Sequence, residues 1–143
     1  MLSVNQIRAD IETKIIALIQ PDPNIFLVPQ NTDIQYDLNT DDDVICKVTV
    51  NFGEAIPGEK GYEGVSRRIC LLAVNLYCLW GTGTGRILDV CKVFEDAFRR
   101  LEMTSASGDQ ILFGDSYTDG GFLTETTKFC YVVKVPFWAW VGN

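Results

Sequence analysis

The stretch Ile-Cys-Leu-Leu-Ala-Val-Asn-Leu-Tyr-Cys-Leu-Trp occupies residues 69–80 and decides the fold. Its even-numbered positions are all apolar, and so are most of its odd-numbered positions. Successive side chains point to opposite faces of a strand, so this run predicts a strand that is apolar on both faces. From Ser66 to Trp80 the extended chain would reach about 50 Å, which is longer than a typical strand. We therefore expect it to bend or to project beyond the domain, with its second face covered by loops or by another copy of the protein.

Regular patterns before this run predict one helix and two strands. Ser3 is followed three residues later by Gln6, the arrangement of a capping box. Apolar residues then recur at spacings of three and four, which predicts an amphipathic helix up to Ile19, ended by two prolines. Residues 25–28 predict a short strand. Residues 44–52 alternate between apolar and polar, which predicts a strand with one buried face.

After the run, glycines at 81, 83 and 85 break the strand, and a second amphipathic helix is expected from Arg86 to Leu101. The polar, glycine-containing segments 54–64 and 104–121 are expected to be loops that order on assembly. A last strand is expected from Phe122 to about Val135, followed by an aromatic tail. Together these elements predict a single α+β domain over residues 1–143. Its sheet is expected to be mostly antiparallel and twisted, with two amphipathic helices packed on one face.

Composition narrows the classes of function. The 143 residues carry a formal net charge of −7, so electrostatic attraction to DNA, RNA or anionic lipid is not expected. No segment approaches the roughly 20 apolar residues that a membrane span needs, and no signal peptide is visible at the start of the sequence. The five cysteines are odd in number and form no C-x-x-C pair, which favours reduced core thiols in a cytoplasmic protein.

The sequence contains no histidine, which removes Ser-His-Asp and Cys-His catalysis and the usual zinc ligand sets. Three short segments nevertheless resemble known functional motifs. Residues 113–119 resemble the nucleophile block of GDSL-type esterases, but that mechanism needs a histidine base. The glycines of 81–85 miss the third glycine of a dinucleotide-binding turn. Residues 37–41 match only the opening of an EF-hand loop. We assign no catalytic, cofactor-binding or metal-binding residue, and we expect no enzyme activity.

Several side chains are candidates for an interface with another subunit or a partner. Two basic pairs stand out in an acidic chain, and large aromatic residues gather near the C-terminus, where they would suit buried contacts between subunits. Solvated arginines and core aromatics are the alternative interpretations. The candidate interface residues are Tyr62, Arg67, Arg68, Arg99, Arg100, Phe137, Trp138 and Trp140.

Nearly the whole chain resembles the tail-terminator, or tail-completion, proteins of long-tailed bacteriophages, the group that includes the phage lambda tail terminator. Four features carry the resemblance. They are the opening helix from Ser3 to Ile19 before a proline, the strand that ends Val-Thr-Val-Asn-Phe-Gly at 48–53, the long strand 69–80 that runs through a glycine turn into the helix 86–101, and the closing Val-Lys-Val-Pro-Phe at 133–137.

The resemblance implies a structural subunit of the virion tail, assembled in the host cytoplasm. Such a subunit forms a ring, expected to be a hexamer, that caps the tail tube, stops its polymerisation and presents a surface to the head connector. The implied partners are further copies of the chain, the tail tube protein and a head-completion protein, while the phage DNA passes through without specific binding. The alternatives are another head–tail joining or minor tail protein, and a small-molecule-binding domain with a pocket between helices and sheet near residues 81–85.

Overall fold

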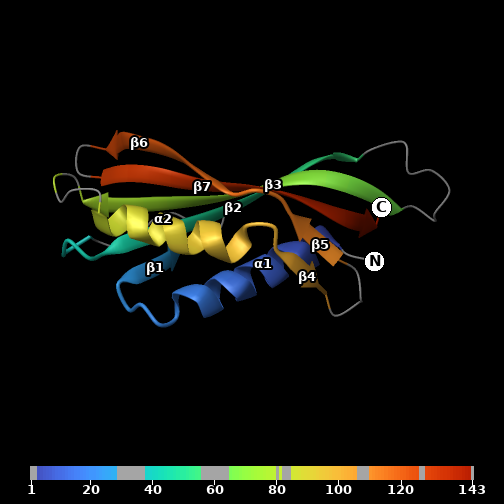
Figure 1. Ribbon diagram of the computed structural model, residues 1–143, viewed down its shortest axis with the longest axis horizontal. Helices are drawn as coiled ribbons and strands as arrows, with labels where there is room; N and C mark the ends of the chain where they lie inside the picture. The colour runs from blue at the N-terminus through green and yellow to red at the C-terminus, as the bar shows by residue number, and fades with distance from the viewer. Residues whose placement is uncertain are drawn as a thin grey trace.

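The computed structural model describes residues 3–28, 38–55, 65–79, 81, 85–105, 110–125 and 128–142, with backbone alone at 54–55, 65–67, 122–125 and 140–142. The fold is α+β, with two helices and a mixed sheet of seven strands in this part of the chain. Figure 1 shows the elements in chain order: α1 (Val4–Ile19), β1 (Ile25–Val28), β2 (Val44–Ala55), β3 (Val65–Leu79), α2 (Gly85–Phe98), β4 (Glu102–Thr104), β5 (Gln110–Phe113), β6 (Tyr117–Glu125) and β7 (Lys128–Gly142).

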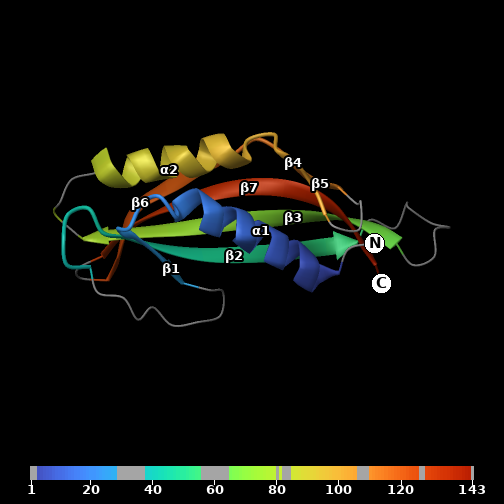
Figure 2. The same cartoon turned by 90° about the horizontal axis from the view of Figure 1, so that it is seen from below.

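The first helix forms as its sequence predicts. The Ser3 hydroxyl oxygen accepts a hydrogen bond from the backbone N–H of Gln6 at 3.1 Å, which satisfies one of the free donors at the start of α1. Isoleucines at every fourth position then place one buried stripe along the helix: Ile7, Ile11, Ile15 and Ile19. The buried stripe of α2 consists of Ile87, Val90, Cys91, Phe94 and Phe98. Figure 2 shows both helices lying along the length of the sheet.

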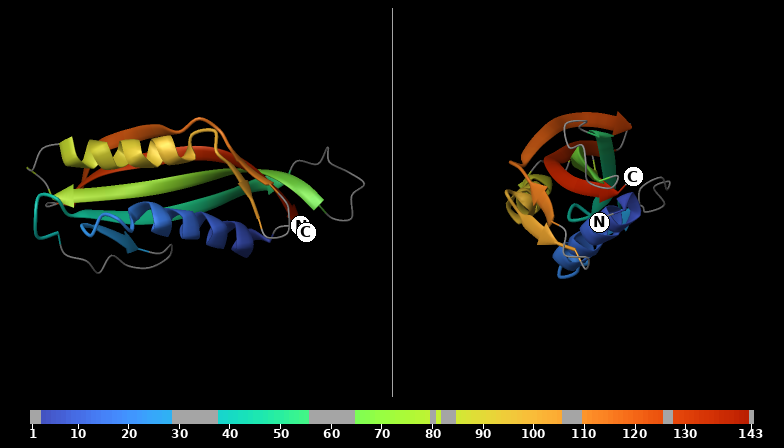
Figure 3. Two further views of the ribbon diagram at one scale, coloured as in Figure 1. Left: turned by 60° about the horizontal axis from the view of Figure 1, so that its bottom comes forward. Right: turned by 90° about the vertical axis from the view of Figure 1, so that its right-hand side faces the viewer.

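Two long strands form the spine of the molecule. β3 and β7 pair antiparallel over their whole length, from Val65 opposite Gly142 to Leu79 opposite Lys128. Figure 3 shows the resulting elongated shape, in which the start of β3 and the end of β7 lie together at one end. The strand order is β1-β2-β3-β7-β5-β4, and β6 pairs with β7 beside β5. The long strand that the sequence predicted therefore has its partner within the same chain.

The first strand pairs in the direction opposite to our expectation. β1 lies parallel to β2, with Ile25 opposite Val44, whereas neighbouring strands were expected to be antiparallel. A parallel connection needs a dozen or more residues to return the chain to the starting edge. Residues 29–43 join the two strands and provide that length. The sheet is therefore mixed, and the short strand β1 lies at one edge of it.

The core forms on one set of alternating residues. In β3 these are the even-numbered residues, of which Leu72, Val74 and Leu76 are completely buried. Their register partners in β2 and β7 belong to the same cluster as the buried stripes of both helices. We call this set the core face of the sheet. The odd-numbered residues of β3, together with their cross-strand neighbours, form the outer face.

The segment 104–121 is not the loop that its polar composition suggested. It contains β5 and the start of β6, both paired with β7. The aromatic tail is also part of β7, which continues through Pro136 to Gly142. The backbone N–H of Gly114 donates to the carbonyl oxygen of Pro136 at 2.8 Å, so Pro136 turns its missing N–H toward the break between β5 and β6. No ladder hydrogen bond is lost there, and the strand tolerates the proline.

Candidate interaction surface

An apolar patch lies on the outer face, where three strands run side by side. Ile69 of β3 pairs with Trp138 of β7, and Trp138 pairs on its other side with Leu112 of β5. Cross-strand partners share a face, so the three side chains form a row across the sheet. Ile69 is 49% exposed and Leu112 is 37% exposed, while Trp138 is partly buried. We call this row the outer patch.

The indole of Trp138 lies close to the backbone of Gly114. A Cβ added at Gly114 would lie 3.3 Å from Cζ3 of Trp138 and 3.4 Å from Cγ of Pro136. Glycine at this position therefore leaves the space that the indole ring occupies. Leu71, opposite Pro136, continues the apolar surface along β3. Leu71 and Pro136 therefore lie beside the outer patch on the same face of the sheet.

A charged pair limits the patch toward the middle of the sheet. Nζ of Lys134 lies 3.1 Å from Oδ2 of Asp119, and this hydrogen bond raises the pKa of Lys134. Both residues are solvent-accessible, so the pair contributes little to stability. On the other side of this pair, away from the outer patch, the outer face is not exposed to solvent, since Ile45, Cys130 and Val132 are buried. The exposed apolar part of the outer face is thus the part nearest the start of β3.

The second basic pair is used within the chain. Nε of Arg100 lies 2.8 Å from Oδ1 of Asp115, and this hydrogen bond lowers the pKa of Asp115. Arg99 lies 3.9 Å from Glu95 across one turn of α2. Arg100 also has a φ of 52°, in the left-handed region, directly after the helix end. Both arginines are exposed, and each lies beside a carboxylate of the same chain.

The other predicted interface residues have different fates. Phe137 is completely buried on the core face, with its ring 5.2 Å from that of Phe113, so its assignment to an interface was wrong. The alternation of β7 explains this, because Phe137 and Trp138 point to opposite faces. Arg68 is partly buried, and its Nε has no hydrogen-bond acceptor among the described residues. Tyr62 lies outside the described residues, as do the side chains of Arg67 and Trp140.

Two residues of the outer patch were missed by the sequence analysis. Ile69 lay inside the doubly apolar run, and nothing local distinguishes its exposed face from the buried one. Leu112 lay in the segment interpreted as a loop. Alternation gives a usable signal for Leu112, because it stands between Ile111 and Phe113, which are both buried. Only the register of three strands brings these residues next to Trp138.

The motif-like segments have structural roles. The Ser116 hydroxyl donates to the backbone carbonyl oxygen of Glu95 at 2.8 Å, which ties the esterase-like segment to α2. The carboxylate of Asp43 accepts hydrogen bonds from the backbone N–H groups of Asn39 and Thr40, at 2.9 and 3.1 Å, and the bond from Asn39 is the main cause of its lowered pKa. The Asp43 side chain thus closes a turn before β2. Among the described residues, no group of cysteine or acidic side chains has the arrangement of a metal site.

The five cysteines are all buried, and none of them forms a disulfide. Burial raises the pKa of Cys46 and of Cys91 to about 12, and that of Cys130 to about 11. At neutral pH these groups are therefore protonated and poorly nucleophilic. The cysteines behave as small core side chains.

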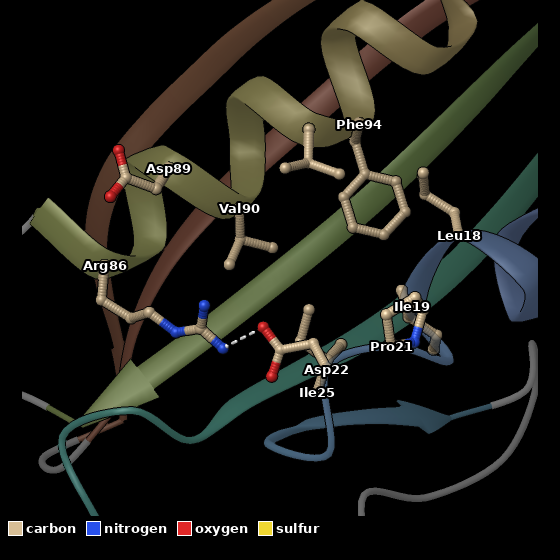
Figure 4. Close-up of a pocket in the computed structure, with 10 residues that line it drawn as sticks. Leu18, Ile19, Pro21, Asp22, Ile25, Arg86, Asp89, Val90 and Phe94 are labelled. Carbon is tan, nitrogen blue, oxygen red and sulfur yellow. Dashed lines mark hydrogen bonds and ion pairs between the residues drawn. The ribbon is translucent and has the colours of Figure 1, made fainter.

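A cavity of about 160 Å³ lies between the end of α1, β1 and the first turns of α2 (Figure 4). It is beside Gly85, near the turn where the alternative interpretation placed a small-molecule pocket. An ion pair between Arg86 and Asp22, with 2.7 Å between nitrogen and oxygen, spans part of its rim. Pockets for small-molecule ligands usually measure about 300–1,000 Å³, so this one is small for that purpose.

Comparisons with known proteins give the fold and little else. No protein-family model and no curated protein matches this chain. A solved structure of a protein whose name describes no function aligns over 97% of this chain and 96% of its own, with a TM-score of 0.71 and 18% sequence identity. The fold is therefore shared almost from end to end with that protein. Among the described helices, none has the length and apolar character needed to cross a membrane.

Proposed function

We propose that this chain is a structural tail protein of a long-tailed bacteriophage, which assembles as a ring on the end of the tail tube. In this proposal the ring stops tube polymerisation and provides the interface to the head connector. The main support is the outer patch. Ile69, Trp138 and Leu112 form an apolar row on the exposed part of the outer face.

The proposed arrangement uses the two faces of the sheet differently. Both helices pack on one face of a mainly antiparallel sheet and complete the core of the subunit. The opposite face carries the outer patch, and this patch is available to a neighbouring subunit. Exposed apolar patches with a polar rim are typical of protein interaction sites, and here Lys134 and Asp119 form part of such a rim.

The charges of the subunit suit a ring that DNA traverses without binding. The chain has a formal net charge of −7, and two of its arginines, Arg99 and Arg100, lie beside carboxylates of the same chain. Phosphate binding depends on cations that are free to replace counterions. We therefore expect no duplex binding at physiological salt, which fluorescence anisotropy with a short duplex would measure.

Electron microscopy of purified tail tubes, with and without the protein, tests the proposal. The expected result is ring-shaped density at tube ends and arrest of further tube growth. A Trp138→Ala variant is expected to lose the caps, while Ile16→Ser, which changes a side chain 51% exposed on α1, is expected to keep them. A protein that stays monomeric and leaves the tube ends bare would contradict the proposal.

A further inference from the structure

The cavity beside α2 is lined by apolar side chains from three elements. Leu18 and Ile19 come from the end of α1, Ile25 from β1, and Val90 and Phe94 from the core stripe of α2. Figure 4 shows the Phe94 ring and the Val90 side chain on one side of the cavity, opposite Leu18 and Ile19. Val93 also lines the cavity and is 47% exposed, so it stands at the opening. The floor is apolar and continuous with the main core, in which Val90 and Phe94 are buried.

The size of the cavity matches one side chain. Its volume of about 160 Å³ is close to that of a protein cavity that binds one benzene molecule, roughly 150 Å³. A free ligand with so few atoms gains limited affinity. A polypeptide that inserts one side chain gains further contact area around the opening. Such area is present at the opening, where Val93 is 47% exposed.

The rim of the cavity has an excess of negative charge. Arg86 is its only cation among the lining residues, and its guanidinium is already used. One nitrogen lies 2.7 Å from Asp22, and Nε donates to the backbone carbonyl oxygen of Asp42 at 3.1 Å. Asp89 lines the rim as well and forms no ion pair with a described residue. Asp41 and Asp42, in the adjacent turn, are exposed.

We propose that this cavity is an anchor site for a partner polypeptide, and that it accepts one phenylalanine- or leucine-sized side chain flanked by lysine or arginine. The apolar floor buries the anchor side chain, and the acidic rim favours cations on the flanking residues. The site is separate from the outer patch and goes beyond the proposed function. Loss of this site would leave the outer patch and its contacts unchanged.

Three short peptides test the proposal on the full chain. Acetyl-Lys-Phe-Lys-amide, acetyl-Glu-Phe-Glu-amide and acetyl-Lys-Ser-Lys-amide would be titrated while amide chemical shifts around Val90 and Phe94 are followed by NMR. Phenethylamine serves as the free-ligand probe. The expected order of affinity places the Lys-Phe-Lys peptide first. Shifts produced equally by Lys-Ser-Lys would overturn the role of the apolar anchor, and phenethylamine binding as tightly as the peptide would overturn the polypeptide as occupant.

Matched variants connect the binding to the cavity. Val93→Trp covers the opening and is expected to weaken the Lys-Phe-Lys peptide at least about tenfold. Leu88→Trp makes the same change on the same helix outside the lining, and is expected to leave binding within about twofold. Asp89→Asn is expected to reduce the preference for Lys-Phe-Lys over Glu-Phe-Glu by about two- to fivefold, the size of an exposed charge interaction. Binding that is equal in all three variants, with circular dichroism unchanged, would overturn the assignment.

Discussion

The two faces of β3 have similar composition and opposite surroundings. On the core face, Leu72, Val74 and Leu76 are completely buried, in one cluster with the buried residues of both helices. On the outer face, Ile69 is 49% exposed, and its neighbours Leu71 and Ala73 are only partly buried. Hydrophobic burial stabilises a fold by roughly 25 cal/mol per Å² of apolar area, and the exposed part of the outer face does not contribute this free energy in the single chain. The comparison shows that the fold of the single chain leaves apolar area exposed on the outer face of β3.

The largest expected effect comes from two adjacent residues on opposite faces. Phe137→Ala should lower the free energy of unfolding by about 3–5 kcal/mol, because it leaves a cavity in the core. Trp138→Ala should lower it by less than about 1.5 kcal/mol, since the indole is only partly buried, and should weaken assembly more than folding. Urea unfolding would measure both. Equal losses of stability would mean that the outer face belongs to the core.

A smaller effect is expected where two strands approach closely. A Cβ added at Gly53 would lie 2.2 Å from the carbonyl oxygen of Ile69, so alanine cannot fit unless β2 and β3 move apart. Gly53→Ala should therefore cost about 1–3 kcal/mol, the usual range for overpacking. Gly85→Ala is the matched control, because a Cβ there meets nothing within 4 Å. A neutral result at Gly53 would show that the bulge in β2 at this position is easily displaced.

The unfolding free energy at alkaline pH should report the burial of Cys46 on the core face. Burial raises the pKa of Cys46 to about 12, above the value near 8.5 expected in the unfolded chain. The folded state keeps this proton while the unfolded state loses it. The stabilisation is therefore complete below the unfolded pKa and is lost as pH rises toward 12. Cys46→Ala should make the decline in unfolding free energy shallower by about 1.4 kcal/mol per pH unit above pH 9. An unchanged slope would mean that Cys46 is accessible to solvent.

The smallest effects on stability are expected in the outer patch itself. Ile69→Ser and Leu112→Ser each change a side chain that is more than a third exposed, so each should alter the unfolding free energy by about 0.5 kcal/mol or less. Thermal unfolding followed by circular dichroism would measure this. Loss of more than about 2 kcal/mol in either variant would place that residue in the core.

The sequence predicted the elements that have strong local patterns. The Ser3 cap and the isoleucine stripe predicted α1, and both are confirmed. The alternation of residues 44–52 and the long apolar run predicted β2 and β3. β5 and the first part of β6 lay in a predicted loop, and the end of β6 was merged with β7 into one predicted strand. Strand preference depends on packing against neighbours more than on the residues themselves. The predicted strand ended at about Val135, whereas β7 continues through Pro136, because a proline is tolerated beside the break between β5 and β6.

The candidate surface was predicted only in part. Trp138 was selected for its size and place in the chain, while Phe137 was selected with it and belongs to the core. The two differ only in which face they point to, which the strand assignment decides and composition does not. Ile69 and Leu112 join Trp138 through pairing between segments far apart in the sequence. Register of this kind is fixed by the whole sheet and cannot be obtained from one segment.

Sedimentation velocity of the wild-type chain and of the Ile69→Ser/Leu112→Ser double variant, over a range of protein concentrations, tests the central claim most directly. If the outer patch is an interface between copies, the wild type should shift to larger species as concentration rises, and the double variant should remain monomeric with an unchanged circular dichroism spectrum. The account is contradicted if both proteins sediment as monomers at every concentration, or if both associate to the same extent.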